Sequence, residues 1–222
     1  MEAIVARMGQ SRAENRAQFR PYVVTREYKL FGKEKGKTRS QVIADVAFVP
    51  PDSKKFTIQQ TTGSGLGGTI VRRMLANEAE VTKDYTATDF SPDNYEFRFL
   101  RVENVMNHHC YVLELLPRRQ DKRLLHGEIW VDANTYLPHR SEGELAKSPS
   151  WWVRDVRVAF VYGLVGEMWL QTASEASANV RILGRSIMVS QDTSYKLNEG
   201  ITTAAISPGG NLHRPRLVAA PH

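Results

Sequence analysis

A glycine-rich segment has the spacing of a known phosphate-binding motif. Gly63, Gly65 and Gly68 form G-x-G-x-x-G between a strand-like and a helix-like run, and Asp84 lies where a ribose-binding acid would be expected. In a dinucleotide-binding unit such glycines bring backbone amides to a pyrophosphate at a helix N-terminus. That unit continues with alternating helices and parallel strands, whereas this chain continues with seven strand-like runs. We therefore interpret the glycines as a flexible loop that positions a covering helix.

Histidines and the one cysteine are the residues that could bind a metal ion. His108, His109 and Cys110 are consecutive, and consecutive residues of a strand point to opposite faces. His126 and His139 are scattered in the same way. We therefore expect no metal site, and no other pattern indicates a cofactor.

Patterns for catalysis have simpler structural explanations. Glu142 and Glu144 share a strand face, as do Glu128 and Asp132, which acid–base catalysis would require. Alternating charges are equally typical of the solvent face of an antiparallel strand. The G-x-S-x-G nucleophile motif is absent from the sequence, and Cys110 begins an apolar run typical of a core cysteine. We expect a non-enzymatic protein, and a hydrolase would need a converging nucleophile and base.

The elements that must position these side chains are mainly strands. Residues 2–19 have the spacing of an amphipathic helix that ends before Pro21, and Ile70, Val71, Met74 and Leu75 mark the apolar stripe of a second helix. Because no helical run separates the later strands, they are expected to pair as antiparallel neighbours. The predicted strands are 22–30, 42–48, 56–60, 95–102, 110–116, 124–133, 136–145, 152–162, 168–173 and 180–190.

The pattern predicts a mainly β (α+β) fold with a curved antiparallel sheet. One face of each alternating strand is apolar and must be covered, and a long sheet with few helices curves and leaves an apolar concavity. Strand alternation alone does not identify the concave face. Large rigid rings suit an apolar ligand. The candidates for lining the concavity are Phe97, Phe99, Trp130, Trp169, Met74 and Leu75.

Composition excludes several classes of protein. Of 222 residues, 41% are hydrophobic and 24% are charged, which is typical of a globular chain. The net charge is +6, but the basic residues are spread along the chain, so we expect no nucleic-acid partner. No apolar run is long enough to span a bilayer. The first residues lack the pattern of an export signal, so either the protein is cytoplasmic or its signal has been removed.

The segment from Cys110 to Glu144 resembles the outer-membrane lipoprotein-sorting family, the LolA-like and LolB-like periplasmic carriers. The similar elements are Leu115-Leu116-Pro117, Ile129-Trp130-Val131-Asp132 and Thr135-Tyr136-Leu137-Pro138-His139-Arg140. The segment 151–184 is similar to the closing strands of that family, and the resemblance extends from Ile4 to about Ser190. Residues 147–156 depart from the typical pattern and indicate a divergent member.

The resemblance implies a half-barrel of about eleven strands covered by two or three helices. It implies a periplasmic carrier that holds lipoprotein acyl chains or another lipid, whose export signal is absent from this sequence. The acyl-handling residues of the family do not map onto this chain, so none is carried over. The alternative is an envelope protein-interaction or sensor module with the same fold and no small ligand. We expect one domain over residues 1–190, followed by a partly loose extension over 191–222.

Overall fold

Strands make up most of the molecule, as the alternating sequence pattern predicts. The computed structural model describes residues 1–32, 38–63, 65–105, 107–151, 153–181, 184–197 and 202–204. Runs rich in branched and aromatic side chains favour strands because these side chains pack well on a pleated surface. The strands are β1 (Tyr22–Phe31), β2 (Thr38–Val49), β3 (Ser53–Gly63), β4 (Tyr95–Val105), β5 (His108–Pro117), β6 (Leu125–Asp132), β7 (Pro138–Leu145), β8 (Val153–Val165), β9 (Met168–Val180), β10 (Gly184–Leu197) and β11 (Thr202–Ala204).

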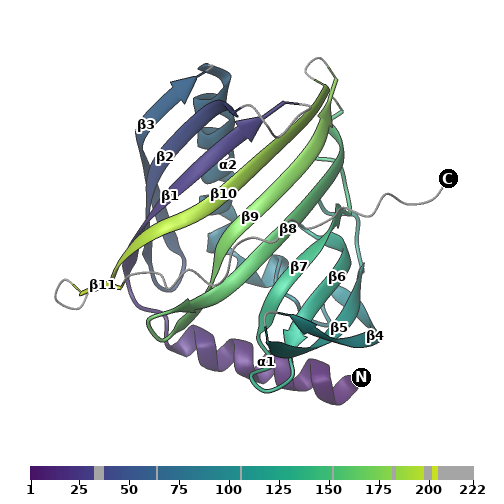
Figure 1. The fold of residues 1–222 in the computed structure, drawn as a ribbon. Helices are drawn as coiled ribbons and strands as arrows, with labels where there is room; N and C mark the ends of the chain where they lie inside the picture. The colour runs from purple at the N-terminus through teal and green to yellow at the C-terminus, as the bar shows by residue number, and fades with distance from the viewer. Residues whose placement is uncertain are drawn as a thin grey trace.

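The eleven strands in the described part of the chain form one antiparallel sheet. Its order is β3-β2-β1-β10-β9-β8-β7-β6-β5-β4, and β11 pairs with β10 beside this path. Most neighbours are consecutive in the chain, but β1 pairs with β10, where Tyr22 lies opposite Leu197. The sheet is open, with β3 and β4 at its edges, and it curves markedly (Figure 1). The predicted mainly β fold with about eleven strands is confirmed.

Helix α2 (Gly65–Lys83) covers one half of the concave face. It follows the edge strand β3, and the short 3-10 turn η1 (Tyr85–Ala87) follows it before β4 begins at the other edge (Figure 1). Its apolar stripe includes Val71 and Leu75, which are fully buried against the β1–β3 side of the sheet. The glycine-rich segment therefore lies where β3 gives way to α2. The sheet that follows is antiparallel, so the chain has no βαβ unit over the described residues.

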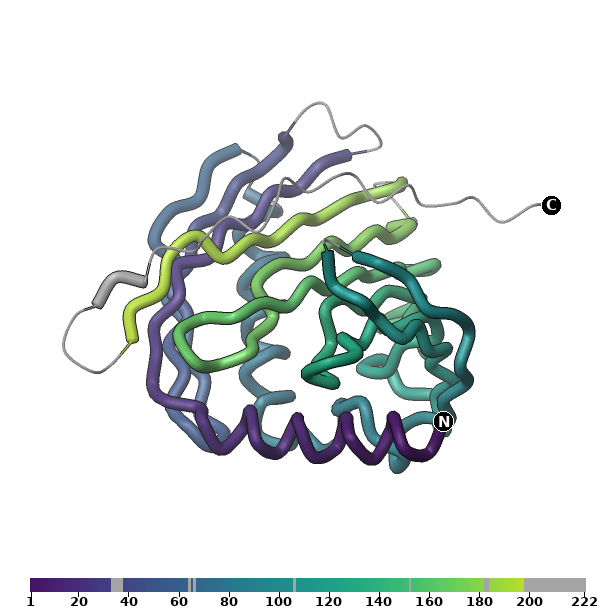
Figure 2. The backbone as a smooth tube through the Cα atoms, turned by 60° about the horizontal axis from the view of Figure 1, so that its bottom comes forward, coloured from purple at the N-terminus to yellow at the C-terminus, as the bar shows by residue number. Residues whose placement is uncertain are grey.

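Helix α1 (Glu2–Ala17) runs across one end of the curved sheet (Figure 2). Met8 is its buried residue, and it packs with Leu113 and Ile129 of β5 and β6. The chain leaves the helix at Gln18, and Pro21 could not continue it because proline lacks the backbone N–H. Neither described helix combines the length and the apolar composition needed to cross a membrane.

The buried apolar residues of the concave side form two separate clusters. The first cluster joins α2 to β1 and β2 and includes Val24, Tyr28 and Leu75. The second cluster joins α1 to β4–β6 and includes Met8 and Leu113. The concave face is therefore not one continuous core, because each helix covers a different part of the sheet.

Some predicted features extend past or lie outside the described structure. Strand β10 continues to Leu197, beyond the predicted domain boundary at residue 190. Residues 33–37, between the first two predicted strands, and Trp152 lie outside the described residues, as does most of the predicted C-terminal extension.

Candidate functional site

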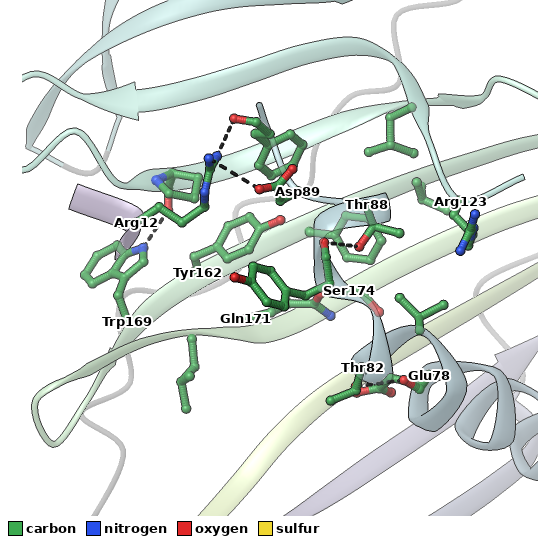
Figure 3. Close-up of a pocket in the computed structure, with 18 of the residues that line it drawn as sticks. Arg12, Glu78, Thr82, Thr88, Asp89, Arg123, Tyr162, Trp169, Gln171 and Ser174 are labelled. Carbon is green, nitrogen blue, oxygen red and sulfur yellow. Dashed lines mark hydrogen bonds and ion pairs between the residues drawn. The ribbon is translucent and has the colours of Figure 1, made fainter. Parts of the chain in front are cut away.

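A cavity of about 660 Å³ lies between the two clusters on the concave side. Met8 and Ile129 line it from the second cluster, and Leu170 lines it from the first. Side chains of α1, α2 and several strands surround the space (Figure 3). The volume is in the range of ligand pockets for small molecules. The split between the two clusters thus leaves room for a ligand.

Small side chains on β9 and β10 help to leave this space open. Ser174, Ala176 and Ser190 line the cavity, and Phe160 of β8 lies opposite Ser174 in the sheet. The hydroxyl oxygens of Ser174 and Ser190 are 2.7 Å apart, so they hydrogen-bond to each other. These two polar groups are therefore satisfied without a ligand.

A charged network borders the cavity beneath α2. Arg26 of β1 is almost fully buried and donates to both carboxylate oxygens of Asp192 on β10. Arg26 also lies 3.2 Å from Glu78 of α2, and Lys54 of β3 lies 2.7 Å from the same carboxylate. Because buried charges are tolerated only when they are paired, this network ties α2 to three strands.

The network changes the proton affinity of Glu78. Burial disfavours the charged carboxylate, but Lys54 and Arg26 more than offset it and lower the pKa of Glu78 to about 2. The same surroundings hold the pKa of Arg26 well above its ordinary value, since Glu78 and Asp192 outweigh its burial. Both groups are therefore charged at neutral pH.

The α1 side of the cavity has a second set of polar contacts. Arg12 forms an ion pair with Asp89 at 3.3 Å and donates to the carbonyl oxygen of Phe90 (Figure 3). The side chain of Asn15 accepts from the backbone N–H of Trp169 at 2.7 Å and donates to its carbonyl oxygen at 2.9 Å. These contacts join α1 to β9 and to the segment before β4.

The six predicted lining residues occupy different places. Met74 and Trp169 line the cavity, and the indole N–H of Trp169 donates to the carbonyl oxygen of Pro138 at 2.7 Å (Figure 3). Leu75, next to Met74 in the sequence, is buried in the first cluster and is not among the residues that line the cavity.

The other three predicted residues are not among those that line the cavity. Trp130 packs with Cys110 and Val112, on the face opposite its strand neighbours in the second cluster. Phe97 packs beside Tyr95 at the edge of the second cluster. Phe99 is 48% exposed.

Three of the four carboxylates considered for acid–base chemistry form ion pairs with arginines, and the fourth, Asp132, is buried. The three pairs are Glu128 with Arg101, Glu142 with Arg140, and Glu144 with Arg157.

Cys110 is fully buried and poorly suited to act as a nucleophile. Its burial, together with the nearby carboxylates of Asp132 and Glu103, raises the pKa of its thiol to about 11.

One group of metal-capable side chains does come together. His108, Asp132 and His139 place one donor atom each within 4.8 Å of the others. Reasoning on chain neighbours missed this group because its members come from β5, β6 and β7. Asp132 lies opposite Cys110, and His108 lies two residues before Cys110 on the same face of β5, so strand pairing brings the two side chains together.

The comparisons with known proteins identify the fold. No protein family model matches the chain, and no curated protein matches its sequence. A domain of Vibrio parahaemolyticus described as an outer membrane lipoprotein-sorting protein matches with a TM-score of 0.50 and 16% identity, over 88% of this chain and 92% of that chain. The predicted resemblance to lipoprotein-sorting proteins is thereby confirmed for the fold, at a divergent level of sequence.

Two further structures match less closely. A DUF1329 family protein from Desulfovibrio piger has a TM-score of 0.48 and 14% identity, covering 90% of this chain and 94% of that chain. A LolA superfamily protein from Nitrosomonas europaea has a TM-score of 0.39 and 11% identity, covering 89% of this chain and 93% of that chain.

Proposed function

We propose that this protein is a non-enzymatic carrier of the bacterial periplasm that holds lipoprotein acyl chains or another lipid in the cavity between its two clusters. In this role it takes part in outer-membrane lipoprotein sorting. The observation that carries the proposal is the cavity of about 660 Å³ on the concave face. The shared fold with a lipoprotein-sorting domain supports the role, but a fold alone does not determine function.

The lining of the cavity suits a molecule with an apolar body and a polar end. Leu170, Ile129 and Phe160 offer apolar surface, while Arg12 and Glu78 lie at different sides of the same space. Each buried methylene contributes about 0.8 kcal/mol, so ten would contribute about 8 kcal/mol before the cost of association. Binding of this strength needs no covalent step.

The first test is lipid uptake by the wild-type protein. We expect fatty acid or phospholipid to co-purify and to appear by native mass spectrometry and after organic extraction. A fluorescent fatty acid should bind with an affinity in the micromolar range or better. A lipid-free mass together with no uptake would overturn the carrier role and favour the protein-interaction alternative.

A matched pair of variants tests where the lipid binds. Ala176→Phe places a ring in the cavity and is expected to reduce uptake at least tenfold without loss of folding. Gln191→Phe adds the same ring to an exposed position of β10, beside the inward-facing Ser190, and should leave uptake unchanged. Equal uptake by Ala176→Phe and the wild type would place the lipid elsewhere.

A further inference from the structure

Two histidines face one buried carboxylate where β6 turns into β7. Nδ1 of His108 lies 2.9 Å from Oδ2 of Asp132, and Nε2 of His139 lies 3.7 Å from the same oxygen. The centroids of the two imidazole rings are 4.0 Å apart. One nitrogen of each ring is therefore directed at one carboxylate oxygen.

The spacing of these atoms is close to that of a metal site. Zn²⁺ binds histidine nitrogen and carboxylate oxygen at about 2.0–2.2 Å in a tetrahedron, which separates the donor atoms by about 3.3–3.6 Å. The two donor distances to Asp132, 2.9 and 3.7 Å, lie on either side of this range. The histidine nitrogens lie within 4.8 Å of each other, so both rings would move on binding: the exposed His108 ring away from Oδ2 by about 0.5 Å, and the two nitrogens to a tetrahedral separation.

A local irregularity of the sheet directs His139 to this position. Trp130 pairs with Arg140 and Val131 pairs with Pro138, so His139 is the extra residue of a β-bulge. Bulges change the direction of a side chain and are frequent beside functional sites. Regular pairing would not give His139 this position.

The other oxygen of Asp132 is held by the turn that follows β6. Oδ1 accepts from the backbone N–H of Asn134 at 2.9 Å and from that of Thr135 at 2.8 Å, and from the Thr135 hydroxyl at 3.2 Å. These bonds orient the carboxylate so that its other oxygen, Oδ2, faces the two histidines. Hydrogen bonds of this kind orient the ligands of many metal sites.

We propose that His108, Asp132 and His139 bind one divalent transition-metal ion, with Zn²⁺ as the best match to two imidazoles and one carboxylate. The Asp132 and His139 side chains are 3% and 12% exposed, whereas the His108 side chain is 48% exposed. The ion thus enters from the His108 side and keeps a coordination position open to water. This proposal replaces the expectation of no metal site, which considered only chain neighbours.

The site lies next to the wall of the cavity. The His139 ring packs edge-on against Trp169, with centroids 5.1 Å apart, and Trp169 lines the cavity. A bound ion would join β5, β6 and β7 and would fix the ring against which Trp169 packs. Metal binding does not depend on the identity of the cavity ligand, so it can be tested separately.

Calorimetric titration of the untagged full chain with ZnCl₂ tests the proposal. We expect one ion per chain with micromolar affinity, and His108→Ala should weaken binding about tenfold or more. His109→Ala is the matched control because His109 is exposed and contacts Asn104 instead of Asp132. Its affinity should stay within twofold of the wild type. Equal affinity of wild type and His108→Ala, or no binding by the wild type, would overturn the site.

A second measurement does not depend on the folding of any variant. Co²⁺ bound by the wild-type chain in place of Zn²⁺ should give the strong visible absorption of a tetrahedral site. Zn²⁺ should also raise the thermal midpoint of the wild type, because it binds only the folded state. A weak octahedral cobalt spectrum, with no change in midpoint, would contradict the proposal.

Discussion

Arg26 is a charged residue at an inward-facing position of β1. It lies between Val24 and Tyr28 on the same face of the strand, and both are buried in the first cluster. The period of two already places residue 26 on this face, although its charge argues against burial. The carboxylates of Glu78 and Asp192 compensate for that charge, and they come from α2 and β10. Sequence alone does not reveal partners so distant in the chain.

The lowered pKa of Glu78 predicts a loss of stability in acid. The pKa of Glu78 is about 2 in the folded protein and 4.5 ordinarily. As the pH falls, Glu78 of the unfolded chain is therefore protonated before Glu78 of the folded protein. The stabilisation that ionised Glu78 gives to the folded protein is therefore complete above pH 4.5 and is lost as the pH falls toward 2. We expect the difference in unfolding free energy between wild type and Glu78→Gln to be constant from pH 7 to pH 5 and to shrink below pH 4.5.

Urea unfolding followed by circular dichroism at a series of pH values measures this difference. Glu80→Gln removes an exposed carboxylate from the same helix and controls for the loss of one charge. A difference between wild type and Glu78→Gln that stays constant down to pH 3 would contradict the assigned role of Lys54 and Arg26.

Among the elements, α2 depends on a close approach to the sheet at its first turn. A Cβ atom at Gly67 would overlap both side-chain atoms of Ser40 on β2. Ser40 is buried and its hydroxyl donates to the carbonyl oxygen of Thr62 at 3.0 Å, so it cannot easily move away. The glycine-rich segment thus allows α2 to pack closely against the sheet. We interpret the same segment, from its sequence, as a loop that positions a covering helix.

Gly67→Ala is therefore expected to destabilise the protein by about 1–3 kcal/mol through overpacking. Gly65→Ala is the matched control, because among the described residues no atom lies within 4 Å of its Cβ position. That variant should be as stable as the wild type or slightly more so, since alanine favours helix. Urea denaturation measures the unfolding free energy of both variants. Equal values for Gly67→Ala and Gly65→Ala would show that α2 can shift away from Ser40 without loss of stability.

The elements were predictable from the sequence to a large extent, and their partners were not. Period-two runs and turn residues locate the strands because both signals are local. The insertion of β10 between β1 and β9 is a long-range event that no local pattern encodes. The bulge at His139 likewise depends on pairing, which explains why the metal-capable group was missed. Of the six residues predicted to line the concavity, Met74 and Trp169 line the cavity, because the direction of each strand side chain depends on register and curvature that a local pattern does not encode.

At the scale of the whole molecule, the cavity exists because two helices cover an open sheet at two separate places. Helix α2 is tied to the sheet by a packed apolar stripe and by the charged network around Arg26. Helix α1 buries little besides Met8, and polar contacts hold much of its remaining length. A helix held mainly by polar contacts opens at a lower free energy than a packed one. The α1 side is therefore the expected route into the cavity.

Asn15→Ala tests this route, because it removes both hydrogen bonds between α1 and the backbone of Trp169. Loss of about 1–2 kcal/mol of local stability should speed amide exchange in residues 2–17 about tenfold, as measured by hydrogen–deuterium exchange. Gln10→Ala is the control, since Gln10 bonds to Glu14 within the same helix. A fluorescent fatty acid should also leave Asn15→Ala faster than the wild type. Unchanged exchange and release would mean that the Asn15 hydrogen bonds do not control the opening of α1 and that the ligand enters elsewhere.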